Sequence, residues 1–143
     1  MSINEIQDRI IEETADLTDW MDRYAYIIEL GEALPPMPEG EKTPDNLIEG
    51  CQSRVWISAE LDKDGKVVYQ ADSDALIVKG IVAMLLDVLN GHSPKEILDA
   101  DLYFIDKMGL KNHLSPTRSN GLVAMVKQMR MYALAFSVSE ELD

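Results

Sequence analysis

The feature that most constrains the fold is a strand–turn–strand pattern in the middle of the chain. Apolar and polar residues alternate over residues 54–61, which is typical of a strand with one face in a core. The next four residues, Asp-Lys-Asp-Gly, favour a hairpin turn, and residues 66–71 return as a second strand. Residues 46–49 are a candidate for another short strand. The pattern predicts a small antiparallel sheet.

Helical patterns flank this sheet on both sides. Ser2 and Glu5 form a capping box ahead of isoleucines at helical spacing, and Asp19 begins a second helix for which Gly31 is a plausible stop. Four prolines between residues 35 and 44 exclude a regular helix or central strand there. Later helices are expected near residues 75–89, in a short stretch that begins at Ser93, near residues 104–108 and over residues 115–136. We therefore expect one α+β domain over residues 1–143.

The charge balance excludes two classes of partner. The chain has 13 basic and 26 acidic residues and a net charge of −13, so nucleic acid and anionic lipid would both repel it. The N-terminus lacks the basic patch and apolar core of a secretory signal, and the apolar run near residues 75–89 is shorter than a membrane span of about 20 residues. These patterns predict a cytoplasmic protein that binds neither nucleic acid nor membrane.

Cys51 is the only cysteine, which limits its chemistry. It cannot form an internal disulfide, and with two well-separated histidines it is not expected to build a metal site. Gly50 precedes it at a chain reversal beside the predicted strand, where a partner could reach the sulfur. Two interpretations remain open, a small buried apolar residue and an accessible nucleophile.

Two charged residues at predicted helix starts are further candidates. Arg118 lies in the first turn of the final helix, where the positive end of the helix dipole disfavours a cation by up to about 1 kcal/mol. Arg118 is therefore expected either to pair with an acid or to belong to a functional site. Residues that go against a local preference, here the preference for acids in the first helical turn, concentrate at functional positions. Asp74, at another helix start, is either a partner for Arg118 or only a cap.

Three segments together resemble the SufE family, whose members accept sulfur from cysteine desulfurases during iron–sulfur cluster assembly. They are Gly50-Cys51-Gln52-Ser53-Arg54-Val55-Trp56, Asp72-Ser73-Asp74-Ala75-Leu76-Ile77-Val78-Lys79-Gly80 and Leu114-Ser115-Pro116-Thr117-Arg118-Ser119-Asn120-Gly121-Leu122. The resemblance implies an α+β fold similar to the cluster scaffold IscU, with a three-stranded antiparallel sheet and helices packed on it. It also implies Cys51 as persulfide acceptor, with Arg118 and Asp74 as further site residues.

The function that the resemblance implies is a sulfur carrier. Cys51 would take sulfane sulfur from a desulfurase persulfide, stimulate that enzyme and deliver the sulfur for cluster assembly. The implied partners are a SufS-like cysteine desulfurase and a SufBCD-like scaffold complex. No cofactor is expected on this chain, because pyridoxal phosphate belongs to the desulfurase. The chain is thus expected to be a transfer partner and activator more than a stand-alone enzyme.

Two other functions stay open from the residues alone. A cysteine hydrolase would pair Cys51 with His92 or His113 as base, and it would also need an oxyanion hole. A non-catalytic interaction module would carry Cys51 only incidentally.

Overall fold

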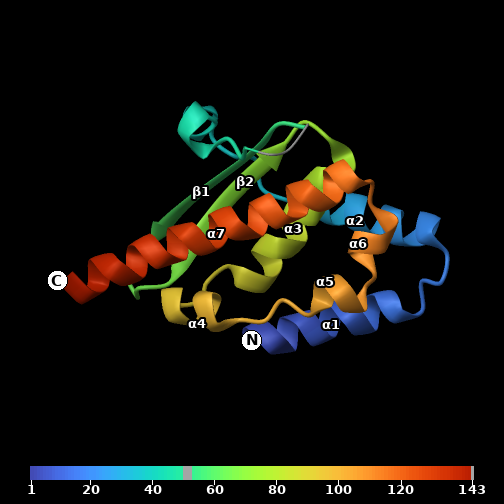
Figure 1. Ribbon diagram of the computed structural model, residues 1–143, viewed down its shortest axis with the longest axis horizontal. Coiled ribbons are helices and arrows are strands. Elements are labelled where there is room, and N and C mark those ends of the chain that lie inside the picture. Colours follow the sequence, from blue (N-terminus) through green and yellow to red (C-terminus); the bar gives the residue numbers. More distant parts are fainter. Residues whose placement is uncertain (50–52, 143) are drawn as a thin grey trace.

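The structure, a computed structural model, describes residues 1–49 and 53–142. Figure 1 shows helices arranged around a long β-hairpin. In chain order the elements are α1 (Ile3–Ala15), α2 (Trp20–Glu32), the 3-10 turns η1 (Glu39–Glu41) and η2 (Pro44–Asn46), β1 (Val55–Leu61), β2 (Val67–Ser73), α3 (Leu76–Leu89), α4 (Pro94–Asp99), α5 (Phe104–Lys107), α6 (Leu110–His113) and α7 (Pro116–Leu142).

Within the described residues the sheet has two strands, so the expectation of three is wrong. β1 and β2 pair antiparallel from Val55↔Ser73 to Leu61↔Val67. In place of a third strand, Leu47 makes a single bridge to Trp56. The physical reason is local: η2 occupies the chain up to Asn46, which leaves too few extended residues before the Cys51 segment for a ladder to form.

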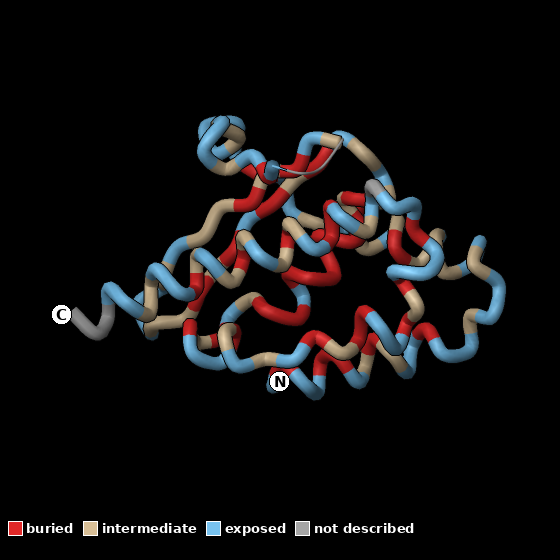
Figure 2. The backbone as a smooth tube through the Cα atoms, in the orientation of Figure 1, coloured by how far each residue is buried: buried red, intermediate tan, exposed pale blue. Residues whose placement is uncertain are grey.

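The core lies where the hairpin meets α3 and α7. Figure 2 shows the buried positions concentrated on α3 and recurring along both strands. α3 packs against α2, β2 and α7, and α7 also packs against β1 and α4. The inward strand residues are Val55, Ile57, Val67, Tyr69 and Ala71, all buried. This alternation confirms the strand pattern that the sequence predicts.

The crossing of α2 and α3 depends on two glycines. A Cβ on Gly80 would lie 2.0 Å from the Ile27 carbonyl oxygen, and a Cβ on Gly31 would lie 2.8 Å from the Gly80 nitrogen. Gly31 was expected to end its helix, but α2 continues to Glu32. The glycine is needed for the close approach of two backbones rather than as a stop signal.

The starts of α1, α2 and α4 agree with the sequence patterns. Capping boxes join Ser2 with Glu5 and Ser93 with Glu96, and the Asp19 carboxylate accepts the Met21 amide. α7 extends further than expected, to Leu142. Over residues 1–49 and 53–142, none of the helices combines the length and the apolar character that crossing a membrane requires.

Candidate functional site

Hydrogen bonds join the two sides of the cysteine segment, the stretch between residues 49 and 53 that contains Cys51. Cys51 itself lies outside the described residues. On either side of the segment, the Ile48 amide donates to the Val55 carbonyl at 2.8 Å, and Leu47 bridges to Trp56. The chain therefore leaves the sheet and returns to it at one point, the start of β1. A segment tied at its base in this way is suited to presenting a side chain to a partner.

Asp74 lies at the returning end of this segment. Its Oδ1 accepts the Arg54 amide at 3.0 Å, and its own amide donates to the Arg54 carbonyl at 3.2 Å. The Ser73 hydroxyl donates to the same carbonyl at 2.8 Å. Asp74 is not the cap of α3, because that position is Ala75, whose amide donates to the Ser73 hydroxyl. Both peptide groups of Arg54 are thus fixed by the end of β2.

Arg118 lies in the first turn of α7 and is exposed. Its amide donates to the Ser115 hydroxyl at 3.3 Å, so the helix start that the sequence predicts is present. Among the described residues its guanidinium forms no ion pair, with Asp74 or with any other acid. The structure therefore does not bring Asp74 and Arg118 into contact. The relation of either residue to the Cys51 thiol stays a prediction.

A cluster of charges on the outer face of the hairpin gave no signal in the sequence. Asp72 lies opposite Trp56 in the ladder, and its carboxylate contacts Lys42 Nζ at 2.8 Å and Lys79 Nζ at 3.3 Å. The Lys42 ammonium also lies 5.6 Å from the centre of the Trp56 ring, within cation–π range. These contacts tie the proline loop to β2, close to the described end of the cysteine segment.

The ionisation of this cluster follows from its contacts. Burial raises the pKa of Asp72, but hydrogen bonds from Lys42, the Ser73 amide and Lys79 outweigh it, and the net pKa is below the ordinary value. The hydrogen bond to Asp72, followed by that to Glu39, raises the pKa of Lys42. The Asp72 carboxylate and the Lys42 ammonium therefore stay charged at neutral pH, beside the start of β1.

A hollow of about 500 Å³ adjoins the segment before Cys51. Residues 44–49 form one wall and α7 forms the other; the lining residues are Pro44, Asp45, Leu47, Ile48, Glu49, Ala124, Lys127, Gln128 and Met131. Tyr132 joins the two walls, because its hydroxyl lies 2.9 Å from both Asn46 Oδ1 and the Ile57 carbonyl. Residues 44–49, which precede the cysteine segment, are thus held against α7.

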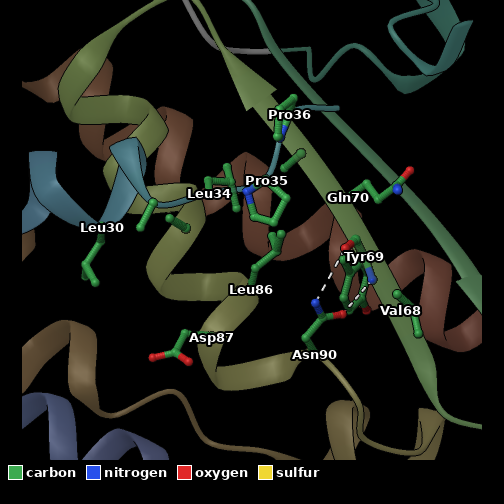
Figure 3. A pocket seen from close by; sticks show the side chains of 13 residues that line it. Leu30, Leu34, Pro35, Pro36, Val68, Tyr69, Gln70, Leu86, Asp87 and Asn90 are labelled. Carbon is green, nitrogen blue, oxygen red and sulfur yellow. Dashed lines mark hydrogen bonds between the residues drawn. The ribbon is translucent and has the colours of Figure 1, made fainter. Parts of the chain in front are cut away.

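A second hollow, of about 640 Å³, lies elsewhere, and neither Asp74 nor Arg118 lines it. It is bordered by the end of α2, the proline loop, β2 and α3, and Figure 3 shows the side chains that line it. Within it, the Tyr69 amide donates to Asn90 Oδ1 at 2.6 Å. This hydrogen bond gives an acceptor to a backbone amide on the edge of β2 that does not pair with β1. The lining of this hollow is mainly apolar; the Asp87 carboxylate pairs with Arg9, and the Tyr69 hydroxyl donates to the Met129 carbonyl.

The two histidines make structural contacts. His92 is buried, and its ring nitrogens lie 3.0 Å from the Met1 carbonyl and 3.3 Å from the Leu89 carbonyl. His113 stacks on Trp20 with ring centres 3.8 Å apart. Among residues 1–49 and 53–142, no group of three or more His, Cys, Asp or Glu side chains is placed to hold a metal ion.

Two comparisons with known proteins give the family and a similar fold. Residues 8–133 match the family model "SufE: Fe-S metabolism associated domain". The fold is similar to the solution structure of a hypothetical protein from Thermus thermophilus, with a TM-score of 0.77. The two chains are 23% identical, and the match covers 93% of this chain and 96% of the other. At that identity the likeness shows the fold alone.

Proposed function

The chain belongs to the SufE family, and from this premise we propose that Cys51 accepts sulfane sulfur from a cysteine desulfurase. Family membership gives the chain a role in Fe–S metabolism. The finer proposal is that it carries the sulfur as a persulfide and delivers it for cluster assembly. A SufS-like desulfurase is the proposed donor, and a SufBCD-like scaffold complex is the proposed recipient.

The proposed reaction is a thiolate–persulfide exchange. The Cys51 thiolate attacks the terminal sulfur of a persulfide on the desulfurase, a new S–S bond forms at Cys51, and the old one breaks. The partner cysteine leaves as a thiolate, so charge and electrons balance without an oxidant or reductant. The same exchange, run from Cys51 to an acceptor thiolate, releases the sulfur. Pyridoxal phosphate acts only in the desulfurase.

The observation that carries this proposal is the anchoring of the segment next to Cys51. Asp74 and Ser73 bind both peptide groups of Arg54, and Ile48 pairs with Val55 at the other end. Fixing the base of a loop lowers the entropy lost when that loop docks into a partner. We assign Asp74 as a positioning residue on this ground.

Arg118 has a different proposed role. A net charge of −13 disfavours ionisation of a thiol, so an attacking thiolate needs a cation or donors nearby. Arg118 is exposed and makes no ion pair among the described residues, which leaves its charge available to Cys51 or to a partner's anion. We propose that it favours the thiolate.

Desulfurase turnover with and without this chain tests the proposal. The intact protein should stimulate turnover on cysteine, whereas Cys51→Ser should not, although serine is close to isosteric with cysteine and should leave the fold intact. Ser53→Ala, a change in the same segment, is the matched control and should stimulate normally. Full stimulation by the Cys51→Ser protein would reject the acceptor role and would favour a non-catalytic interaction module instead. Hydrolysis of thioesters or amides by the chain alone would favour a cysteine hydrolase instead.

A further inference from the structure

Charge is strongly segregated along this chain. Residues 107–139 contain five basic residues and no acidic one, whereas the remainder contains eight basic and 26 acidic residues. Most of the basic segment is α7, the long helix that crosses the hairpin (Figure 1). Basic residues on a protein of net charge −13 favour contact with a negatively charged partner; the two acids that share a hollow with Lys127, Asp45 and Glu49, lie in the hollow formed with residues 44–49.

The outward face of α7 also carries an apolar stripe. Val123, Met131, Leu134 and Val138 are 53%, 52%, 52% and 46% exposed. Together with Lys127 they recur every three or four residues, so they lie on one side of the helix over about 22 Å. Figure 2 shows exposed positions recurring along α7. Exposed apolar residues that gather on one face indicate an interaction site more than scattered ones do.

A hollow runs beside this stripe, between α7 and α4. Its volume is about 370 Å³, and its lining is Leu98, Val123, Val126, Lys127, Arg130, Met131 and Leu134. Among the described residues that line it, Lys127 and Arg130 are the charged ones. The hollow therefore combines an apolar floor with positive charge at its edge. An amphipathic helix with an apolar stripe and flanking carboxylates has the complementary surface.

The two cations have no acidic partner among the described residues. The Arg130 Nη2 donates to the Ala100 carbonyl at 2.7 Å, while its Nε is buried and has no hydrogen-bond partner there. A guanidinium held in this way lacks the carboxylate that it pairs with best. An incoming acidic side chain would supply it.

We propose that this α7 face, defined as Val123, Lys127, Arg130, Met131, Leu134 and Val138, is a docking surface for an acidic amphipathic helix of a partner protein. A second copy of the chain fits less well. Two-fold pairing of the stripes would centre near Arg130 and bring the cations of both copies together, which disfavours the pair. An anionic membrane also fits less well, because the remainder of the protein would be repelled by it.

The test uses the full chain and a synthetic probe. The probe is an 18-residue helical peptide with leucines along one face and flanking glutamates, and the matched peptide has lysines in place of the glutamates. We expect the acidic peptide to bind, to shift amide resonances of residues 123–138 and to weaken with salt, while the lysine peptide does not bind. Lys127→Glu should weaken binding about tenfold. Lys107→Glu, the same charge change at an exposed site on α5, should leave binding unchanged.

Other outcomes would overturn the proposal. Equal binding of both peptides, shifts outside α7, or unchanged affinity in the folded Lys127→Glu protein would each reject it. Leu134→Gln distinguishes docking into the hollow from a purely ionic contact. Docking requires this variant to bind the acidic peptide more weakly, and unchanged binding would reject the proposal. Binding to phosphatidylglycerol vesicles in preference to the peptide would replace the protein partner with a membrane. A dimer that Met131→Glu dissolves would replace it with a second copy. Since the test does not involve Cys51, its result is independent of sulfur transfer.

Discussion

Replacing Asp74 with alanine removes one of the contacts that hold the cysteine segment. The change deletes the 3.0 Å hydrogen bond from the Arg54 amide and leaves the two bonds to the Arg54 carbonyl in place. A hydrogen bond to a charged group contributes about 1.5–3 kcal/mol, but both residues are exposed and water replaces the lost acceptor. We therefore expect a loss near 1 kcal/mol, which is about fivefold in the local opening equilibrium.

Amide hydrogen exchange measures this opening at the residue itself. The Arg54 amide should exchange about fivefold faster in the Asp74→Ala protein, while the melting temperature falls by about 3 °C. Asp74→Asn is the matched control, because its side-chain oxygen still accepts the amide, and its exchange should stay within about twofold of the original. Unchanged protection of Arg54 in the alanine variant would refute the role of Asp74 as an anchor.

Three further predictions concern the core, the charge cluster and the thiol. Gly80→Ala should destabilise the fold by more than about 3 kcal/mol, because its Cβ would meet the Ile27 carbonyl at 2.0 Å; thermal melting checks this, and Gly40→Ala, with open space around its Cβ, should be neutral. Burial raises the pKa of Asp72, but its hydrogen bonds lower it more. Asp72→Asn should therefore lower stability at pH 7, and the difference should shrink as the pH falls below about 4; an equal difference in urea unfolding at pH 7 and pH 2.5 would contradict this. Arg118→Ala should slow alkylation of the cysteine thiol near neutral pH without lowering the melting temperature, and the opposite result would make the arginine structural.

Local signals predicted much of the fold. The hairpin, both capping boxes and the start of α7 depend on residues within a few positions of each other, and all of them are present. The third strand was not predictable in the same way. Residues 46–49 have strand character, yet η2 extends to Asn46, and the contact with β1 is a single bridge at Leu47 with one hydrogen bond from Ile48.

Long-range contacts escaped the sequence patterns. In the sequence, Gly31 resembles a helix stop. Its actual role depends on Gly80, which packs against it but lies far along the chain, so no local pattern reveals it. Asp74 looks like a cap for α3, because its hydrogen bond to Arg54 depends on the register of the hairpin. Lys42 gave no signal at all, since its contact with Asp72 joins a proline loop to a distant strand. In each case the partner is set by tertiary packing.

The most direct test of the central claim is a mass measurement on the chain after reaction with a donor. The protein is incubated with a cysteine desulfurase, pyridoxal phosphate and cysteine, trapped with an alkylating reagent and digested. The account predicts a gain of about 32 Da, one sulfur atom, on the peptide that contains Cys51, and no gain in the Cys51→Ser protein. An unmodified Cys51 peptide under conditions where the desulfurase turns over would contradict it.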